Sequence, residues 1–247
     1  MNDYLLAALL GIVEGLTEFL PISSTGHMLL VENIVGVDLE LPFWKMFTVV
    51  IQVGAILAVV VFYAGRLRRL LADFIVPSPR DGKPPPPRWR HPLVLVVAAV
   101  VPAGIIGVVA KKQVDTLMEH ALPIGLALLF GGLAIELIER LRQGRDRVTD
   151  MAEVSPLQAL AIGFAQAIAL IPGISRSGAT IMGGRLCGLT TRAAADFSFL
   201  LSIPTMTAAA GYSLYKHRVP LSERDWCVLA VGFAVSFVAS EYFTFMG

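Results

Sequence analysis

Long apolar runs without a charged residue alternate with short polar stretches along the chain. The four longest are each close to the ~20 residues that a helix needs to cross a bilayer, and they span residues 46–65, 92–110, 154–175 and 197–215. Further candidates are two shorter runs, 121–135 and 226–240. This pattern predicts an all-α, polytopic helical membrane protein that forms a single transmembrane domain over residues 1–247.

The first apolar stretch, residues 4–13, follows Asp3 and runs directly into Glu14. It has no basic leader, which a secretory signal peptide would carry. We therefore expect this stretch to belong to the mature protein rather than to a cleaved targeting segment.

Two of the apolar stretches are interrupted by segments rich in Pro, Gly, Ser and Thr. Motif 1 is EGLTEFLPISSTGH over 14–27, and motif 2 is PGISRSGAT over 172–180. Ionisable groups at membrane depth cost roughly 3 kcal/mol each on insertion scales unless they face a cavity or one another, so their presence there indicates function. We interpret the two motifs as halves of one buried active site.

The two motifs also indicate an internal repeat. A shift of 152 residues aligns Glu14 with Gln166, Ile22 with Ile174, Ser23 with Ser175 and Gly26 with Gly178. A similar apolar span follows each motif at the same shift, and a constant shift favours a repeat over chance matches. Repeat one covers about 1–138 and repeat two about 154–247.

The number of spans between the motifs predicts the orientation of the repeats. If each motif is the tip of a re-entrant broken helix, the spans between them are 46–64, 92–110 and 122–138. An odd number inverts the second copy, and irregular backbone is tolerated at membrane depth only around a cavity. We therefore expect an inverted-topology repeat whose two re-entrant helices meet at the membrane midplane.

Composition and charge agree with a membrane protein and suggest its orientation. Hydrophobic residues make up 55% of the chain and charged residues 16%. The stretch 66–91 holds seven Arg or Lys against Asp73 and Asp81, which makes it cytoplasmic by the positive-inside rule. Its proline cluster, Pro77, Pro79 and 84–87, cannot sustain a helix or a sheet, so we expect a solvated linker within this cytoplasmic loop. The arginines of 140–147 agree with this orientation, whereas the basic residues of 216–225 do not.

These features disfavour nucleic-acid binding and a structural role for the cysteines as disulfides or metal ligands. The basic residues are better explained by topology than by nucleic-acid binding. The two cysteines, Cys187 and Cys227, offer neither a disulfide framework nor a metal-binding spacing.

Motif 1 carries groups suited to proton transfer and to cation binding. Glu14 and Glu18 are four residues apart, so they project from one face of a helix that we expect to end near Pro21. Two adjacent carboxylates repel, and sharing a proton or a divalent cation, Mg2+ or Ca2+, relieves the repulsion. The alternative is that both acids simply mark a helix end at the membrane interface.

Hydroxyl groups follow these acids and precede His27. They belong to Ser23, Ser24 and Thr25. A hydroxyl beside a general base suggests an activated nucleophile, with His27 or a glutamate taking the proton. Helix capping by these residues and a structural role for His27 stay open as alternatives.

Motif 2 carries groups suited to anion binding. It places Arg176 in a turn that we expect to open a helix from Ser177 onward. Backbone N–H groups at a helix start bind phosphate oxygens, and a guanidinium adds two parallel hydrogen bonds. The other candidate binding residues are Gly173, Ser175, Ser177, Gly178 and Thr180. If Arg176 were only an ion-pair partner of the motif 1 acids, the surrounding donors would be unexplained.

Both motifs resemble the signature motifs of the undecaprenyl diphosphate phosphatases, membrane enzymes linked to bacitracin resistance. The likeness covers nearly the whole chain, including 47–63 and 192–204. It implies hydrolysis of undecaprenyl diphosphate to undecaprenyl phosphate and inorganic phosphate at the cytoplasmic membrane. It also implies a divalent cation and an active site that opens toward the outer, periplasmic face.

The resemblance assigns roles position by position. Glu14 and Glu18 correspond to the family's paired acids, and Ser24 and His27 to its candidate nucleophile and base. The phosphate-binding group corresponds to Ser175, Arg176 and Thr180. Family members usually continue with one more helix after the one that begins near Trp226, so either the C-terminus is truncated or that helix is dispensable.

A transporter or flippase of a phosphorylated lipid is the main alternative, because inverted repeats with broken helices are also carrier architecture. A carrier needs the anion clamp but not the nucleophile. A lipid phosphatase of the acid-phosphatase type needs a second histidine, and His27 is the one histidine in the two motifs. The expected partners are a polyprenyl diphosphate substrate and membrane lipids, without nucleic acid, and a homodimer stays open.

Overall fold

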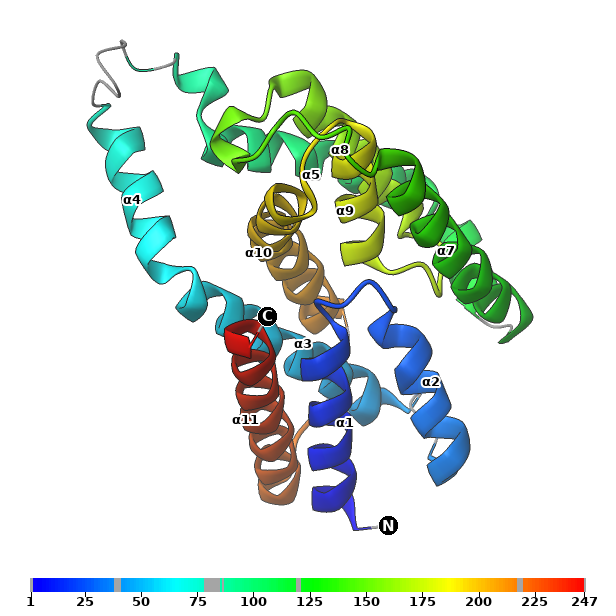
Figure 1. Ribbon diagram of the computed structural model, residues 1–247. Coiled ribbons are helices and arrows are strands. Elements are labelled where there is room, and N and C mark those ends of the chain that lie inside the picture. Colours follow the sequence, from blue (N-terminus) through cyan, green and yellow to red (C-terminus); the bar gives the residue numbers. More distant parts are fainter. Residues whose placement is uncertain are drawn as a thin grey trace. The chain divides into compact units, whose positions relative to one another are not determined.

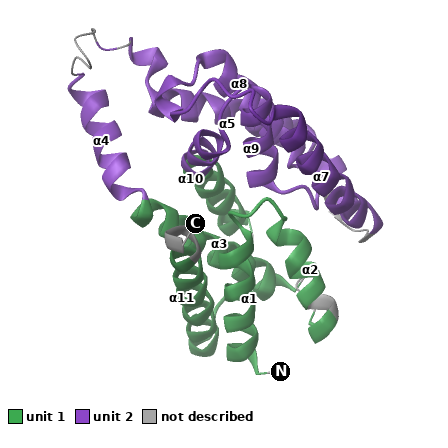
Figure 2. Cartoon of the chain, in the orientation of Figure 1, with its two compact units in different colours: residues 1–62, 202–247 green, residues 63–201 purple. Residues whose placement is uncertain are grey.

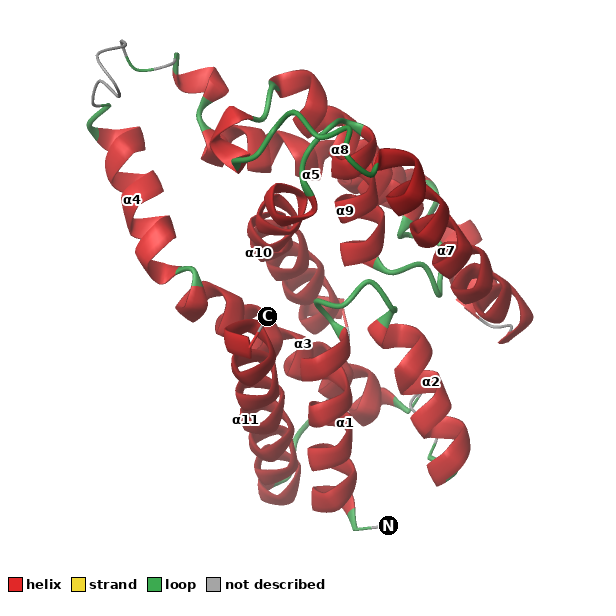
Figure 3. Cartoon of the chain, viewed as in Figure 1, coloured by secondary structure: helices red, strands yellow, loops and turns green. Residues whose placement is uncertain are grey.

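Helices joined by short loops make up the chain in the computed structural model, which describes residues 2–37, 41–77, 85, 87–118, 121–216 and 220–246 (Figure 3). The α-helices are α1 (Asp3–Thr17), α2 (Ser24–Val35), α3 (Pro42–Phe62), α4 (Ala64–Ile75), α5 (Pro92–Val109), α6 (Lys111–Met118), α7 (Ala121–Arg142), α8 (Pro156–Ile168), α9 (Arg176–Leu186), α10 (Thr191–Lys216) and α11 (Glu223–Met246). Two short 3-10 helices are η1 (Arg88–Arg90) and η2 (Met151–Glu153).

Five of the helices in the described ranges are long and apolar enough to cross a membrane. They are α3, α5, α7 from Leu122, α10, and α11 as far as Tyr242 (Figure 1). The prediction of an all-α protein with several membrane spans is confirmed at this level. The charge-free run 154–175 is not a single span, because α8 ends at Ile168 and an irregular turn follows.

The expected cytoplasmic loop over 66–91 is helical in its first part, as α4. Apolar side chains recur at helical spacing there, at Leu67, Leu70 and Phe74, and Leu70 is buried. Arg66 anchors the helix through ion pairs to Asp196 at 2.6 Å and to Asp150 at 3.2 Å. Pro77 marks the end of the helical part, and 78–84 and 86 lie outside the described residues.

The chain forms two compact units, shown in green and purple in Figure 2. Unit 1 comprises residues 1–62 and 202–247, and unit 2 comprises residues 63–201. Motif 1, between α1 and α2, belongs to unit 1, whereas motif 2, between α8 and α9, belongs to unit 2. Each unit is therefore built around one broken helix.

In unit 1, α11 packs closely along α1 and α3. Glycines permit this approach, because a Cβ on Gly11 would lie 2.7 Å from the Gly232 carbonyl oxygen and one on Gly15 would lie 2.6 Å from that of Ser236. Small residues at such a spacing let membrane helices approach until their backbones touch. Ser240 Oγ then donates to the Gly15 carbonyl at 3.1 Å. These contacts hold the last turn of α1, which carries Glu14, in a fixed position.

In unit 2, α5 packs along α8, and α7 and α8 both contact α9. Gly163 of α8 lies against the Ala99 backbone of α5, with no room for a Cβ. Gly163 corresponds to Gly11 when the sequence is shifted by 152 residues. Arg185, 2% exposed at the end of α9, forms ion pairs with Glu139 at 3.1 Å and Asp146 at 2.5 Å. The end of α9 is therefore anchored within the unit.

Candidate functional site

Motif 1 is a helix end that places two buried carboxylates one turn apart. The α1 helix ends at Thr17, and the N–H of Glu18 still donates to the Glu14 carbonyl at 2.9 Å. Glu14 is 1% exposed and Glu18 is 9% exposed. Since burial of acids inside an apolar bundle is costly, their position favours function over a simple interfacial helix end.

The hydroxyl of Ser24 donates to Glu18 Oε2 at 2.6 Å. Ser24 is the first residue of α2 and is buried. This separation is in the range of a hydrogen bond to a charged carboxylate. Of the two bases considered for Ser24 from the sequence, a glutamate or His27, the structure therefore pairs the hydroxyl with a glutamate. A carboxylate in this position can accept the hydroxyl proton.

His27 uses its Nδ1 atom in a 2.9 Å contact with the Ser23 carbonyl oxygen. A carbonyl is only an acceptor, so Nδ1 carries a proton there, and Nε2 is the atom through which a neutral ring accepts one. The ring is half-buried. The Nε2 atom is thus the ring atom left to exchange a proton.

The turn between α1 and α2 contains a strained residue. Ser23 has φ of 66°, the left-handed region that residues other than glycine seldom adopt. Its Oγ accepts a hydrogen bond from the Gly26 N–H at 3.4 Å. Such conformations cost about 1–3 kcal/mol and gather at functional sites. The strained turn directs the chain so that Ser24 lies against Glu18.

Motif 2 is the turn that leads from α8 into α9. Gly173 has φ of 95° and lies against α7, where a Cβ would be 2.5 Å from the Ile124 carbonyl oxygen. Ser175 caps α9, because its Oγ accepts from the Gly178 N–H at 3.1 Å and contacts Ser177 Oγ at 2.9 Å. The helix begins at Arg176, one residue before the predicted start at Ser177.

Arg176 and Thr180 are both fixed on α10 through Ser198. Arg176 Nη1 donates to the Ser198 carbonyl at 3.3 Å, and Thr180 Oγ1 lies 2.6 Å from Ser198 Oγ. Thr180 also bonds back to the Arg176 carbonyl at 2.9 Å. Because Ser177 and Thr180 are fully buried, they hold the turn, while Ser175 and Arg176 are partly accessible to a ligand.

The structure therefore brings together several predicted residues within each motif. Glu18 and Ser24 are in contact in unit 1, and Ser175, Arg176 and Thr180 belong to one hydrogen-bonded group in unit 2. Thr25 and Gly178 lie in the first turns of α2 and α9, respectively. The convergence of motif 1 and motif 2 on one site stays a prediction.

Sequence reasoning missed Ser198. It lies 22 residues beyond Arg176, inside an apolar run, and is fully buried. A weak signal was available, since Ser198 and Ser202 are polar residues four apart, on one face of α10. Nothing in the sequence, however, pointed to Arg176 or Thr180 as their partners.

The oxygen donors of motif 1 fit a hard divalent cation. Mg2+ is usually held by one or two carboxylates together with substrate phosphate oxygens and water, and Glu14 and Glu18 supply two buried carboxylates on one helix turn. In the described part of the chain, no group of three or more His, Cys, Asp or Glu side chains forms a metal site. Cys187, which is half-buried, and Cys227, which is exposed, are free thiols.

Comparison with known proteins matches nearly the whole chain to the family that the two motifs resemble. Residues 7–245 match the family model described as bacitracin resistance protein BacA. The chain is 44% identical to undecaprenyl-diphosphatase 2 of Paramagnetospirillum magneticum over 95% of its length and 85% of the relative's. It is 46% identical to the undecaprenyl-diphosphatase of Nitrosospira multiformis over 94% and 81%, and 41% identical to that of Koribacter versatilis over 97% and 87%.

Proposed function

The chain belongs to the family of the bacitracin resistance protein BacA, and we propose that it is a membrane undecaprenyl-diphosphatase. It hydrolyses undecaprenyl diphosphate to undecaprenyl phosphate and inorganic phosphate. Relatives named for this activity match at least 94% of the chain. The observation that carries the proposal is the buried contact between the Ser24 hydroxyl and the Glu18 carboxylate, which is an arrangement for nucleophile activation.

Ser24 attacks the terminal phosphorus of the substrate in this proposal. Its Oγ forms a bond to phosphorus as the phosphoanhydride bond breaks, its proton passes to Glu18, and undecaprenyl phosphate leaves. Water then cleaves the phosphoserine, which releases inorganic phosphate and restores the hydroxyl. His27 exchanges a proton with the attacking water or the leaving oxygen through Nε2. In the alternative route, water attacks phosphorus directly with Glu18 as its base.

Motif 2 holds the diphosphate. Arg176 donates two parallel hydrogen bonds to phosphate oxygens, and the first N–H groups of α9 point toward the same charge. The Arg176 hydrogen bond to the Ser198 carbonyl supports this role, because it limits the positions of the guanidinium before substrate binds. Gly173, Ser175 and Ser177 shape the turn that presents these donors.

A divalent cation, Mg2+ or Ca2+, supplies charge neutralisation for the diphosphate when bound. Glu14 and Glu18 are the residues that would hold it, with further oxygens from the substrate. This assignment predicts that Glu14→Gln and Glu18→Gln each raise the cation concentration needed for half-maximal hydrolysis.

Both motifs function as re-entrant breaks in an inverted-topology repeat. The lengths of α1 and α8 support this arrangement, since helices of 15 and 13 residues reach only about 22 and 20 Å. The hydrocarbon core is ~30 Å thick, so a helix of this length entering from one face ends inside it. We place the two motifs around one diphosphate at the midplane of the cytoplasmic membrane, with the site open to the outer face.

Phosphate release from a polyprenyl diphosphate by the purified protein, with Mg2+ or Ca2+ present, tests the activity. A carrier of phosphorylated lipid would bind the same substrate without releasing phosphate, and that result would replace the proposed enzyme with the alternative. Rapid acid quenching with labelled substrate then separates the two routes. A phosphoserine at Ser24 supports covalent catalysis, whereas full activity of Ser24→Ala supports direct attack by water.

A further inference from the structure

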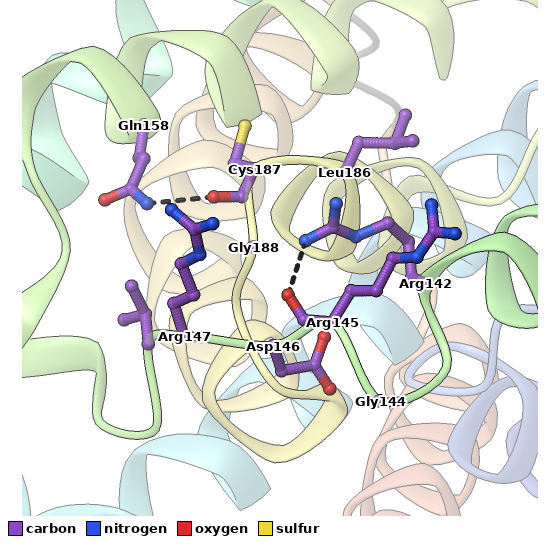
Figure 4. Close-up of a pocket in the computed structure, with 10 residues that line it drawn as sticks. Arg142, Gly144, Arg145, Asp146, Arg147, Gln158, Leu186, Cys187 and Gly188 are labelled. Carbon is purple, nitrogen blue, oxygen red and sulfur yellow. Dashed lines mark hydrogen bonds between the residues drawn. The ribbon is translucent and has the colours of Figure 1, made fainter.

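Unit 2 contains a cavity of about 690 Å³ at the end of α9 opposite to motif 2 (Figure 4). Its walls include Arg142, Arg145 and Arg147, together with Gln158 and Leu186. The α9 helix has 11 residues, so its two ends are roughly 15 Å apart. The cavity, named here the arginine pocket, is thus separate from the group around Arg176.

The arginine pocket has an excess of positive charge. Asp146 is the acidic residue of its wall, and it is 2.5 Å from Arg185 Nη1. Glu139 is also paired with Arg185, which is 2% exposed. Asp146 and Glu139 together carry two negative charges, one of which offsets Arg185, so the group keeps a net positive charge that favours an anion.

The loop that carries these arginines is already fixed by backbone bonds. The N–H groups of Arg147 and Val148 donate to the Gly188 carbonyl at 2.9 and 3.1 Å. Arg142 Nη2 donates to the Arg145 carbonyl at 3.1 Å. The backbone that carries these side chains is therefore ordered before a ligand binds, which lowers the entropy cost of binding.

The pocket lies where a membrane span ends. The apolar span of α7 ends at Arg142, and Leu186 in the pocket wall is 56% exposed. Charged groups at the end of a span lie at the level of lipid headgroups, and basic pockets there recognise anionic lipids. The volume also falls in the range of small-ligand sites.

We infer that the arginine pocket binds a phosphate-bearing anion outside the proposed active site. Three guanidiniums can form parallel hydrogen bonds to phosphodiester or phosphate oxygens. The exposed Leu186 favours the headgroup of an anionic lipid whose acyl chain lies along the apolar surface, and inorganic phosphate offers the same chemistry to the same donors. The pocket is a binding site and takes no part in hydrolysis.

Binding is measured by the thermal shift of the purified full-length protein in detergent. The probes are short-chain phosphatidylglycerol, short-chain phosphatidylcholine and inorganic phosphate. The test variant is Arg145→Gln with Arg147→Gln, because both residues hold the loop through backbone atoms. The matched control is Arg68→Gln with Arg140→Gln, which removes the same charge from exposed residues outside the pocket wall. The parent protein, the test variant and the control are each also prepared with Arg176→Ala added, which weakens the proposed active site.

We expect phosphatidylglycerol to bind at least tenfold more tightly than phosphatidylcholine. The test variant should weaken that binding at least tenfold, and neither the control nor Arg176→Ala should do so. If inorganic phosphate alone shows this dependence on Arg145 and Arg147, the pocket binds free phosphate. If the test variant and the control bind phosphatidylglycerol equally tightly, and also bind inorganic phosphate equally tightly, the inference is overturned.

Two further measurements keep the outcome clear. The melting temperature without ligand reports whether the double variant folds. If it does not fold, the single variant Arg147→Gln replaces it in the binding measurements. Hydrolysis of a polyprenyl diphosphate is assayed in parallel and should be unchanged in the test variant. A protein that binds phosphatidylglycerol through these arginines but releases no phosphate would refute the proposed function and leave the pocket in place.

Discussion

The two helix breaks begin their second helix at matching positions but carry different chemistry. In motif 1 the second helix begins at Ser24, and in motif 2 it begins at Arg176, the same position after the shift of 152 residues. Ser23 and Ser175 both precede the helix start. The acids and the imidazole are not repeated, since Glu14, Glu18 and His27 correspond to Gln166, Leu170 and Ala179 after the shift. The first turn therefore carries groups suited to proton transfer, and the second carries a guanidinium suited to anion binding.

This difference shows which residues serve the helix break and which serve the chemistry. A serine before the second helix and a close-packed glycine, Gly11 or Gly163, occur in both segments. Ser24 corresponds to Arg176 after the shift, so the helix start presents a hydroxyl in one segment and a guanidinium in the other. The comparison predicts different consequences for equivalent substitutions.

Glu18→Gln should have the largest effect. The amide keeps the size of the side chain and can still accept from Ser24, but it cannot take the proton, so turnover should fall ~100 to 10,000-fold. Phosphate release under single-turnover conditions measures this effect. Glu136→Gln, on the exposed surface of α7, is the matched control. Turnover near that of the control would remove the glutamate from proton transfer.

Arg176→Ala should follow, with a loss of ~100 to 1000-fold, because it removes a fixed charge-stabilising donor. Arg176→Lys should restore little, since a lysine cannot form the two parallel bonds. Arg140→Ala provides the control, as Arg140 pairs with Glu136 on the surface. A lysine variant with normal kcat would show that charge alone is needed.

Combining Glu18→Gln with Arg176→Ala sharpens the comparison further. If both motifs act on one diphosphate in the same step, the losses should be strongly non-additive, as for groups that act as a unit. Single-turnover rates of the double variant and of the two single variants measure this coupling. Independent losses that multiply would contradict a shared step.

The sequence predicted the helix breaks well because their signals are local. Proline, glycine and serine next to acids or an arginine interrupt an apolar pattern, and each break was found within a few residues of its observed position. The α4 helix was missed, because the proline-rich residues after Pro77 obscured the helical spacing of Leu67, Leu70 and Phe74. Its anchors, Asp150 and Asp196, are more than 80 residues away in the chain.

Within the candidate site, residue identity was predictable but pairing was not. The hydroxyl, imidazole and carboxylates of motif 1 were all candidates, yet the pattern did not show that Ser24 pairs with Glu18, across a turn in which Ser23 is left-handed. In motif 2, Thr180 was expected to contact phosphate but is buried against Ser198. Contacts across helices depend on packing, which a local pattern does not encode.

Gly15→Ala should reduce stability in motif 1, where the equivalent position of motif 2 already holds Ala167. The new Cβ would lie 2.6 Å from the Ser236 carbonyl oxygen, so α1 and α11 must separate. Overpacking of this kind costs about 1–3 kcal/mol. The melting temperature in detergent measures the loss, and Gly65→Ala, with open space around it, is the control. Equal melting temperatures would show that α1 is not held by this contact.

Ser198→Ala should have the smallest effect, a decrease in kcat/KM of ~3 to 10-fold, the equivalent of one hydrogen bond of about 0.7–1.4 kcal/mol. It removes the Oγ contact to Thr180 but keeps the carbonyl that accepts from Arg176. Thr180→Ala breaks the same contact and also removes the hydrogen bonds to the Arg176 and Ser177 carbonyls, so it should cost at least as much. Thr180→Ser keeps a hydroxyl and should stay near the parent. If Ser198 positions Arg176 only through this contact, the double variant Ser198→Ala with Thr180→Ala should be little worse than Thr180→Ala alone. Losses that multiply in the double variant would mean that the two hydroxyls act separately. That result would support the direct contact between Thr180 and phosphate that the sequence predicted.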